Sequence, residues 1–465
     1  MGLILMIFKR NLLKFYLFNF FFDRVKYAVP LLLIMVTKPV AAIDFNYTLF
    51  STLRHSDNLA QNANAQSGES LNSGGTFSFV NESRSAWFVD MSGSMSKEYF
   101  SDDELSTQDR NTLSASVTYT APKSNFEFLL RDDFSQAPRD RFATQEVGNL
   151  VDVNVITARP SYYFNITPID QIYTEVTYLD STRDSTQNND VIGQESFDFT
   201  NVGKEIRYEK TLNATSAISL VYDSIDTQFS AESNGTDFVQ NNLFLRWVGR
   251  GSRNQLQVEI GRTGVVDEND EDFDTTLFNL LFNRQITLEQ NISFSIRNGV
   301  NFTISQSFID DSINVDDQQS AFGGAQKIKA ANILYTTTGD TISADAQLFY
   351  SEYAATSGQN SEARLGVGLN LTYSMSQYFS TAPQTNITVG YQQNKSKLDV
   401  DIGDDIDNKV EIFDIQFNYF ARPTLSYFLA FQKRDTNSSR ITAQFSAGDS
   451  NSVSVGFNYA PISNR

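Results

Sequence analysis

Short segments of alternating apolar and polar residues recur along the chain from residue 42 to its end. In Leu113–Tyr119, apolar side chains stand at every second position, with Ser114, Ser116 and Thr118 between them. Successive side chains of a β-strand point to opposite sides of the sheet, so this pattern predicts a strand with one apolar and one polar face. The same alternation marks Ile342–Tyr350, Ala363–Met375 and Val453–Tyr459.

No long apolar run occurs beyond residue 42. About ten alternating residues, tilted, span a bilayer only when the strands close into a barrel without unpaired edges. The pattern therefore predicts an all-β fold, a transmembrane antiparallel β-barrel of the outer membrane. We expect this barrel to occupy residues 43–465 as one unit, because no linker in that range indicates a second domain.

The connections between the predicted strands alternate between long polar loops and short turns. About ten long loops, among them Arg262–Asp272 and Lys433–Asn451, imply about 20 strands, and 18 strands fit the pattern nearly as well. The strands near Phe77–Val80 and Leu256–Ile260 are short by this count. Outer-membrane barrels have long extracellular loops and short periplasmic turns, so we expect the same orientation here.

A soluble all-β sandwich or propeller would also alternate and turn. Against it stands the aromatic content, which is 38 Phe and 20 Tyr with only 2 Trp. Many of these rings lie near the ends of predicted strands, where barrels place aromatic girdles at the membrane interfaces. Examples are Tyr162–Phe164, Tyr419–Phe420 and Tyr427–Phe428.

Residues 1–42 differ from the rest of the chain. A basic region that includes Lys9 and Arg10 is followed by the apolar core Ala28–Val36 and then by small residues ending at Ala42. This is the pattern of a secretory signal peptide cleaved after Ala42. The alternative is an uncleaved anchor, but the core is shorter than the ~20 residues of a spanning helix. We expect export and insertion into the outer membrane of a Gram-negative cell.

Charge and cysteine content exclude several classes of partner and site. The formal net charge is −19, which argues against nucleic-acid binding because that requires basic surfaces on the phosphates. The chain has no cysteine, so it forms no disulfide and no thiolate metal site. Closure of the sheet must then supply the stability of the exported protein.

Charged residues on the polar faces of the strands are the candidate functional residues. A charge on the lipid face costs about 2–4 kcal/mol at the midplane, so these side chains are expected to point into the lumen. There they would form a mixed wall that selects permeants by charge and hydrogen bonding, or pair with each other to stabilise the interior. They are Arg131, Arg207, Arg246, Arg297, Arg364, Glu127, Asp133, Glu175 and Glu205.

No catalytic constellation accompanies them, so we expect no enzyme and no cofactor. The single histidine, His55, has Ser56 and Asp57 beside it, but neighbours along a strand point to opposite faces and cannot form a catalytic triad. Three acidic segments are expected to be solvated loops, with loop calcium as the alternative. They are Asp267–Asp274, Asp310–Asp317 and Asp399–Asp407.

The last predicted strand, Ser454–Tyr459, resembles the signal that the barrel-assembly machinery reads, except that a short tail follows it. With Arg54–Asn58, Asn418–Thr424, Arg434–Ser438 and Asn451–Gly456, the chain resembles the β-barrel porin family found beside exopolysaccharide and exosortase gene systems. That resemblance implies an outer-membrane conduit for secreted polysaccharide that works with periplasmic export proteins, and it carries over no catalytic residue.

The expected function is therefore an outer-membrane channel serving polysaccharide export. A general diffusion porin and a plugged structural or adhesive barrel remain as alternatives. The expected partners are outer-membrane lipids and lipopolysaccharide, the barrel-assembly machinery, the polysaccharide and periplasmic export proteins, and no nucleic acid.

Overall fold

The structure is a computed structural model of the full chain. It describes residues 43–59, 66–81, 86–102, 105–138, 150–183, 198–230, 236–268, 272–301, 325–355, 361–375, 378, 385–399, 406–438 and 449–461. Within these residues no helix is long and apolar enough to cross a membrane. The predicted signal peptide and the segment Asp310–Asp317 lie outside the described residues.

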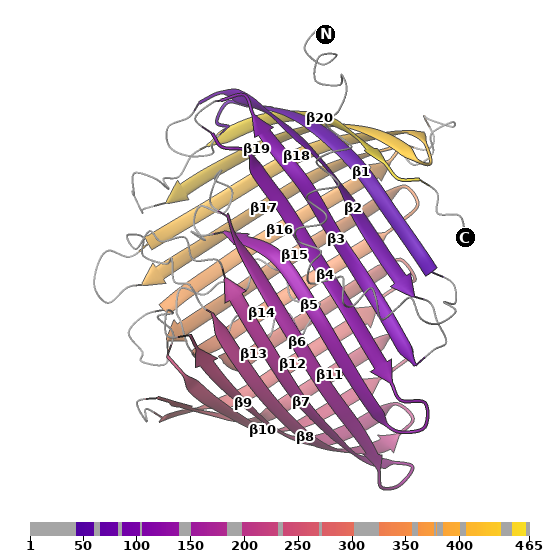
Figure 1. The fold of residues 1–465 in the computed structure, drawn as a ribbon, viewed down its shortest axis with the longest axis vertical. Helices are drawn as coiled ribbons and strands as arrows, with labels where there is room; N and C mark the ends of the chain where they lie inside the picture. The colour runs from indigo at the N-terminus through magenta and orange to yellow at the C-terminus, as the bar shows by residue number, and fades with distance from the viewer. Residues whose placement is uncertain are drawn as a thin grey trace.

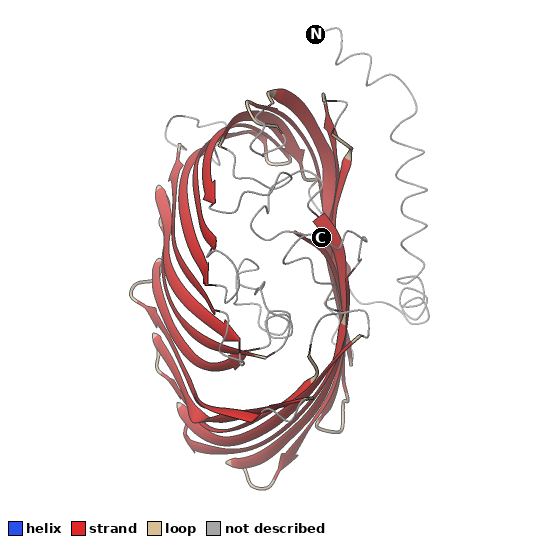
Figure 2. Cartoon of the chain, turned by 90° about the vertical axis from the view of Figure 1, so that its left-hand side faces the viewer, coloured by secondary structure: helices blue, strands red, loops and turns tan. Residues whose placement is uncertain are grey.

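Twenty antiparallel strands form one closed sheet, in which each strand pairs with its neighbours in sequence and β1 also pairs with β20 (Figure 1). This confirms the predicted all-β barrel and the count of 20 rather than 18. Seen from one end of the barrel, the wall has an oblong outline (Figure 2). The strands are β1 (Ile43–Ser56), β2 (Gly68–Asn81), β3 (Trp87–Phe100), β4 (Gln108–Thr120), β5 (Phe126–Pro138), β6 (Leu150–Asn165), β7 (Asp170–Arg183), β8 (Phe199–Asn213), β9 (Ser216–Phe229), β10 (Phe238–Arg250), β11 (Asn254–Asp267), β12 (Asp272–Gln285), β13 (Gln290–Asn301), β14 (Gln326–Thr338), β15 (Ile342–Ala355), β16 (Ser361–Ser374), β17 (Asn386–Asp399), β18 (Ile406–Arg422), β19 (Leu425–Ser438) and β20 (Ser450–Tyr459).

The two ends of the barrel differ in their connections. Strands joined at one end, here called the loop end, are separated by segments as long as residues 302–325. At the other end, here called the turn end, most connections are tight, such as residues 214–215 between β8 and β9. Residues 43 and 459 also lie at the turn end. This asymmetry matches the predicted alternation of long loops and short turns.

Several predicted loops are wrong in length because the strands continue past their apolar segments. The predicted loop Arg262–Asp272 is mostly strand, since β11 runs to Asp267 and β12 begins at Asp272. Likewise β19 extends to Ser438, well into the predicted loop Lys433–Asn451. The strands predicted as short, in β2 and β11, are of ordinary length. Near the loop end, charged outward side chains interrupt the alternation of apolar and polar residues, while the backbone pairing of the strand continues.

Large hydrophobic side chains cover the outer wall. Exposed examples are Leu245 on β10, Leu369 on β16 and Leu429 on β19, each about half exposed. Exposed aromatic rings gather near the turn end, as predicted for Tyr162, Phe164 and Tyr427. The prediction is wrong for Tyr163 and Phe428, which face the interior. An apolar outer wall on a closed barrel is the arrangement of an outer-membrane protein. Other exposed rings of the turn-end girdle are Phe45, Tyr47, Trp87 and Tyr459.

The most buried apolar cluster lies toward the loop end of β6 to β14. Its members come from successive strands and are almost completely inaccessible. Five of its members alternate with outward residues and face the interior rather than lipid, whereas the register sets Val300 opposite the outward Lys327, and Ala325 precedes β14. The five inward members, called here the inner apolar cluster, are Val155, Leu179, Phe199, Phe238 and Val265.

Beyond the last β1–β20 pair, the barrel closure continues into the loop end. The Asp57 amide donates to the Asn451 carbonyl at 3.1 Å, and the Asn451 amide donates to Asp57 Oδ1 at 2.7 Å. The Asn451 side chain donates to Asp57 Oδ2 at 2.8 Å, and buried Asn58 donates to the Asp449 carbonyl at 3.1 Å. These contacts, called here the seam clasp, join the first and last strands.

The seam clasp makes part of the stability dependent on pH. Hydrogen bonds from the side chain and backbone of Asn451 hold the pKa of the Asp57 carboxyl below its ordinary value. This stabilisation is present above the ordinary pKa and is lost as pH falls through the lowered one. We expect Asp57→Asn to cost about 1 kcal/mol or less at neutral pH, since Asp57 is exposed. Urea unfolding of both proteins across acidic pH should show the difference vanish at low pH; a constant difference would contradict the assignment.

Candidate functional site

Strand register decides which side chains face the interior, because directly opposed residues share a face. Arg207 lies between Ile206 and Tyr208, which are 50% and 40% exposed on the outer wall. Arg246 lies between exposed Leu245 and Trp247 in the same way. Following the register around the sheet places all nine candidate residues on the inner face. They are Glu127, Arg131, Asp133, Glu175, Glu205, Arg207, Arg246, Arg297 and Arg364.

Three arginines form short ion pairs with nearly inaccessible carboxylates. Arg131 Nε lies 2.6 Å from Asp133 Oδ2, two residues along β5. Arg246 Nε on β10 lies 2.6 Å from Glu259 Oε1 on β11, its direct cross-strand partner. On the far side of the barrel, Arg364 Nε lies 2.8 Å from Glu362 Oε1. In the last two pairs the guanidinium also donates a charge-assisted hydrogen bond, which fixes the orientation of both side chains.

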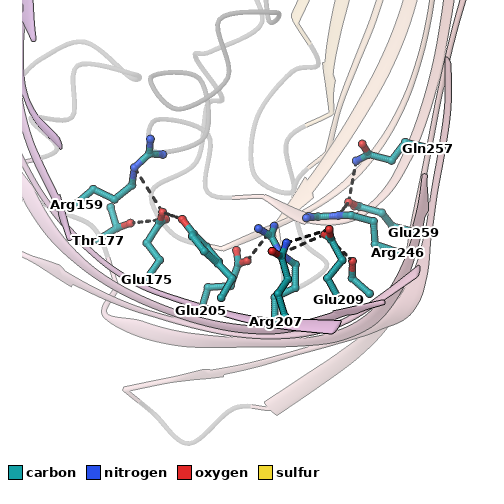
Figure 3. A network of polar contacts seen from close by, with 12 residues as sticks. Arg159, Glu175, Thr177, Glu205, Arg207, Glu209, Arg246, Gln257 and Glu259 are labelled. Carbon is teal, nitrogen blue, oxygen red and sulfur yellow. Dashed lines mark hydrogen bonds and ion pairs between the residues drawn. The ribbon is translucent and has the colours of Figure 1, made fainter. Parts of the chain in front are cut away.

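The densest part of the inner wall spans β6 to β11 (Figure 3). Arg207 approaches Glu205 at 3.4 Å and Glu209 at 4.0 Å, while its guanidinium lies 4.4 Å from the centre of the Tyr173 ring. Figure 3 shows these side chains in a row on the concave side of the sheet. Tyr173 also donates to Glu175. The row is a continuous strip of charged side chains, in which Glu205 lies directly opposite Glu175 on the neighbouring strand.

The strip continues at both ends through residues that the sequence did not single out. Arg159 Nε lies 3.5 Å from Glu175, which also accepts from Thr177 at 3.2 Å. At the other end, Glu259 accepts from Gln257 at 3.0 Å and from Asn279 at 2.8 Å. We call this the charged strip. Its inward members on β6 to β11 are Arg159, Glu175, Glu205, Arg207, Glu209, Asp223, Arg246 and Glu259.

Arg159, Glu209 and Glu259 escaped prediction although each obeys the same alternation. Arg159 precedes a proline, and Glu209 stands in the charged run Lys204–Lys210, so apolar neighbours do not flank them clearly. Glu259 lies between Val258 and Ile260 in the range predicted as a short strand. The signal that could have found them is their position in the two-residue alternation of the strand, and the strand register shows that position directly.

Cationic residues in the strands divide between the faces by type. Every strand lysine faces outward, while most strand arginines face inward; Arg262 and Arg284 are the outward ones, and Arg422 lies at a bulge in β18. A guanidinium forms several directed hydrogen bonds inside a wall, whereas a flexible lysine extends along apolar surface to water. The outward lysines are Lys97, Lys204, Lys210, Lys327, Lys329, Lys395, Lys397, Lys409 and Lys433.

The remaining candidate chemistry is sparse. His55 is exposed on the outer face, opposite Glu69 of β2 and Val453 of β20. Among the described residues, no group of three or more His, Asp or Glu side chains is arranged to hold a metal ion. The acidic segments Asp267–Asp274 and Asp399–Asp407 are described only in part, so loop calcium stays untested.

Comparison with known proteins leaves the family open. No protein-family model matches the chain, and no curated protein matches it. Among solved structures, the chain is similar to the FrpB iron transporter from Neisseria meningitidis, with a TM-score of 0.48, 10% identity, and coverage of 90% of this chain and 83% of that chain. It is also similar to the siderophore receptor PirA from Acinetobacter baumannii, with a TM-score of 0.49, 7% identity, and coverage of 91% and 81%.

Proposed function

We propose that the protein is an outer-membrane channel that conducts a secreted, largely uncharged polysaccharide. The observation that carries the proposal is the polar inner wall of a closed 20-strand barrel with an apolar exterior. Barrels of 16–18 strands already enclose an aqueous channel, so this width suits a hydrated polymer. The resemblance to exopolysaccharide-associated porins in Arg54–Asn58 and Asn451–Gly456 points the same way.

The wall opposite the charged strip is suited to hydroxyl groups. One cross-strand row on the inner face runs Asn332, Phe349, Gly366, Asn394 from β14 to β17, and the next runs Gln347, Gly368, Gln392 from β15 to β17. Side-chain amides donate and accept hydrogen bonds at once, as sugar hydroxyls do. Pore linings of this kind select by hydrogen bonding instead of by charge.

Phe349 adds an apolar surface to this amide wall. A Cβ atom built on Gly366 would stand 2.2 Å from Phe349 Cε1, so the ring lies across the glycine on the next strand. Phe428 lies in the same way across Gly456, at 2.6 Å from such an atom. A ring flattened against the wall offers its face to the interior, where the apolar face of a sugar ring can stack. With amide side chains around it, the Phe349 ring supports a weak contact along which a glycan can slide.

One observation favours the alternative of a closed or plugged barrel. The inner apolar cluster is buried inside the barrel near the loop end, with Phe199 and Phe238 only 2% and 3% exposed. A general diffusion porin is the other alternative, and it would share the polar wall. Cleavage after Ala42, export and the expected periplasmic partners belong to the proposal as well.

Single-channel recording in planar bilayers separates these possibilities. We expect large conductance steps that a neutral glucan such as dextran blocks from one side, and we expect Phe349→Ala to weaken this block several-fold without changing the step size. The matched control is Phe77→Ala, because the Phe77 ring lies over Gly93 in the same way on the outer face. Steps indifferent to glucan would indicate a general porin. Silence under all conditions would overturn the open channel in favour of a plugged barrel.

A further inference from the structure

The outer wall changes from apolar to polar and charged along three adjacent strands, β17, β18 and β19. The next outward residue toward the loop end is polar or charged on each strand. Gln393 lies beyond Tyr391 on β17, Glu411 lies beyond Phe413 on β18, and Lys433 lies beyond Phe431 on β19. The register confirms that these strands lie side by side. Such a boundary marks where the hydrocarbon layer meets the lipid headgroups.

Two lysines oppose each other directly above this boundary. Lys395 on β17 is the cross-strand partner of Lys409 on β18, and both face outward. Directly opposed residues have Cβ atoms about 4.5–5.5 Å apart, and like charges in this arrangement repel. Two opposed ammonium groups are therefore unfavourable unless an anion lies beside each of them, and among the described residues only Lys409 has one, at Glu411.

Carboxylates neutralise the surrounding lysines but not Lys395. Ion pairs join Lys397 to Asp399 at 2.5 Å, Lys409 to Glu411 at 2.9 Å and Lys433 to Asp435 at 3.0 Å. Asp407 faces Lys397 across the strands. On its other side, Lys395 faces Leu365 of β16. Among the described residues, no carboxylate forms an ion pair with Lys395.

Two other outward lysines, on other pairs of neighbouring strands, are balanced by carboxylates, unlike Lys395. Lys97 pairs with Asp109 at 3.3 Å on β3 and β4. Lys329 pairs with Glu352 at 3.4 Å on β14 and β15. In both places the direct cross-strand partner of the lysine is the carboxylate itself. Among the strand pairs that the structure describes, only β17 and β18 set a lysine directly opposite a lysine.

We propose that Lys395 and Lys409 bind a phosphate group of a membrane lipid headgroup. A phosphate carries up to two negative charges and several acceptor oxygens, so it accepts from both ammonium groups at once. The site opens sideways toward lipid at the level of the headgroups, which favours a lipid source over free phosphate. This inference concerns the outer wall and is independent of the proposed channel function.

Native mass spectrometry of the refolded full-length barrel tests the site. The probes are lipid A, its dephosphorylated form and inorganic phosphate. We expect lipid A to stay bound to the wild type, and Lys395→Ala with Lys409→Ala to weaken retention at least ten-fold. The matched control, Lys97→Ala with Lys329→Ala, removes two outward lysines that pair with carboxylates and should leave retention unchanged.

Two further arms keep the result interpretable. Lys395→Arg with Lys409→Arg should retain lipid A, and the unheated mobility of each variant on a denaturing gel reports whether the barrel is folded. Equal retention by the folded alanine variant would overturn the site. Equal retention of dephosphorylated lipid A would overturn phosphate as the ligand group, and displacement by millimolar inorganic phosphate would overturn a lipid as its source.

Discussion

Replacing Arg364 by alanine is expected to lower the free energy of unfolding by roughly 3–5 kcal/mol, because it leaves a buried carboxylate without its cation. Glu362 is 1% exposed, and its Oε1 atom accepts from Arg364 Nε at 2.8 Å. The guanidinium also lies 5.3 Å from the centre of the Tyr353 ring. Urea-induced unfolding in phospholipid vesicles, followed by tryptophan fluorescence, measures the loss.

A double variant shows whether the loss comes from the stranded charge. Glu362→Gln combined with Arg364→Met removes both charges and should recover most of the stability lost in the single variant. If the double variant unfolds as easily as Arg364→Ala, the arginine acts through packing and the ion-pair explanation fails.

Of two neighbouring residues of β16, only the outward one should lose stability when it is replaced by arginine. Leu369→Arg places a charge on the lipid side, where Leu369 is 49% exposed near the middle of the strand. We expect a loss of roughly 2–4 kcal/mol in the free energy of unfolding. The adjacent Gly368 faces the interior, and a Cβ atom there would meet nothing within 4 Å.

Gly368→Arg is therefore the matched control for Leu369→Arg. We expect its stability to remain within about 0.5 kcal/mol of the wild type, as for other substitutions with room around them. In bilayer recordings the added inward cation should shift the reversal potential toward anion selectivity. Equal destabilisation by both variants would mean that the assignment of the two faces of β16 is wrong.

Alternation was sufficient to predict the all-β barrel, and the count of long loops predicted about 20 strands with 18 as the alternative. Alternation failed at strand ends near the loop end, where outward charges such as Lys397, Lys409 and Lys433 replace apolar residues while the backbone pairing continues. Apolar residues alternate with polar ones only where a strand crosses the hydrocarbon layer, and these strands are longer than that layer is thick.

Contacts between distant parts of the chain were beyond sequence reasoning. Asp57 and Asn451, which are 394 positions apart, both belong to segments quoted for the family resemblance, yet nothing in one segment indicates the other. The structure brings them together in the seam clasp because the barrel closes there. The charged strip likewise required the register, since Arg246 meets Glu259 only through the pairing of β10 with β11.

The division of cations between the two faces gives the barrel two separately addressable surfaces. Amine-reactive reagents would decorate the outside of the strands, at lysines such as Lys204 and Lys433. Guanidine-directed dicarbonyl reagents would instead act mainly inside, at residues such as Arg207. Because the chain has no cysteine, a single introduced thiol would add a third chemistry at any chosen site. The same molecule can thus be anchored by its exterior, altered in its interior and read out at one point.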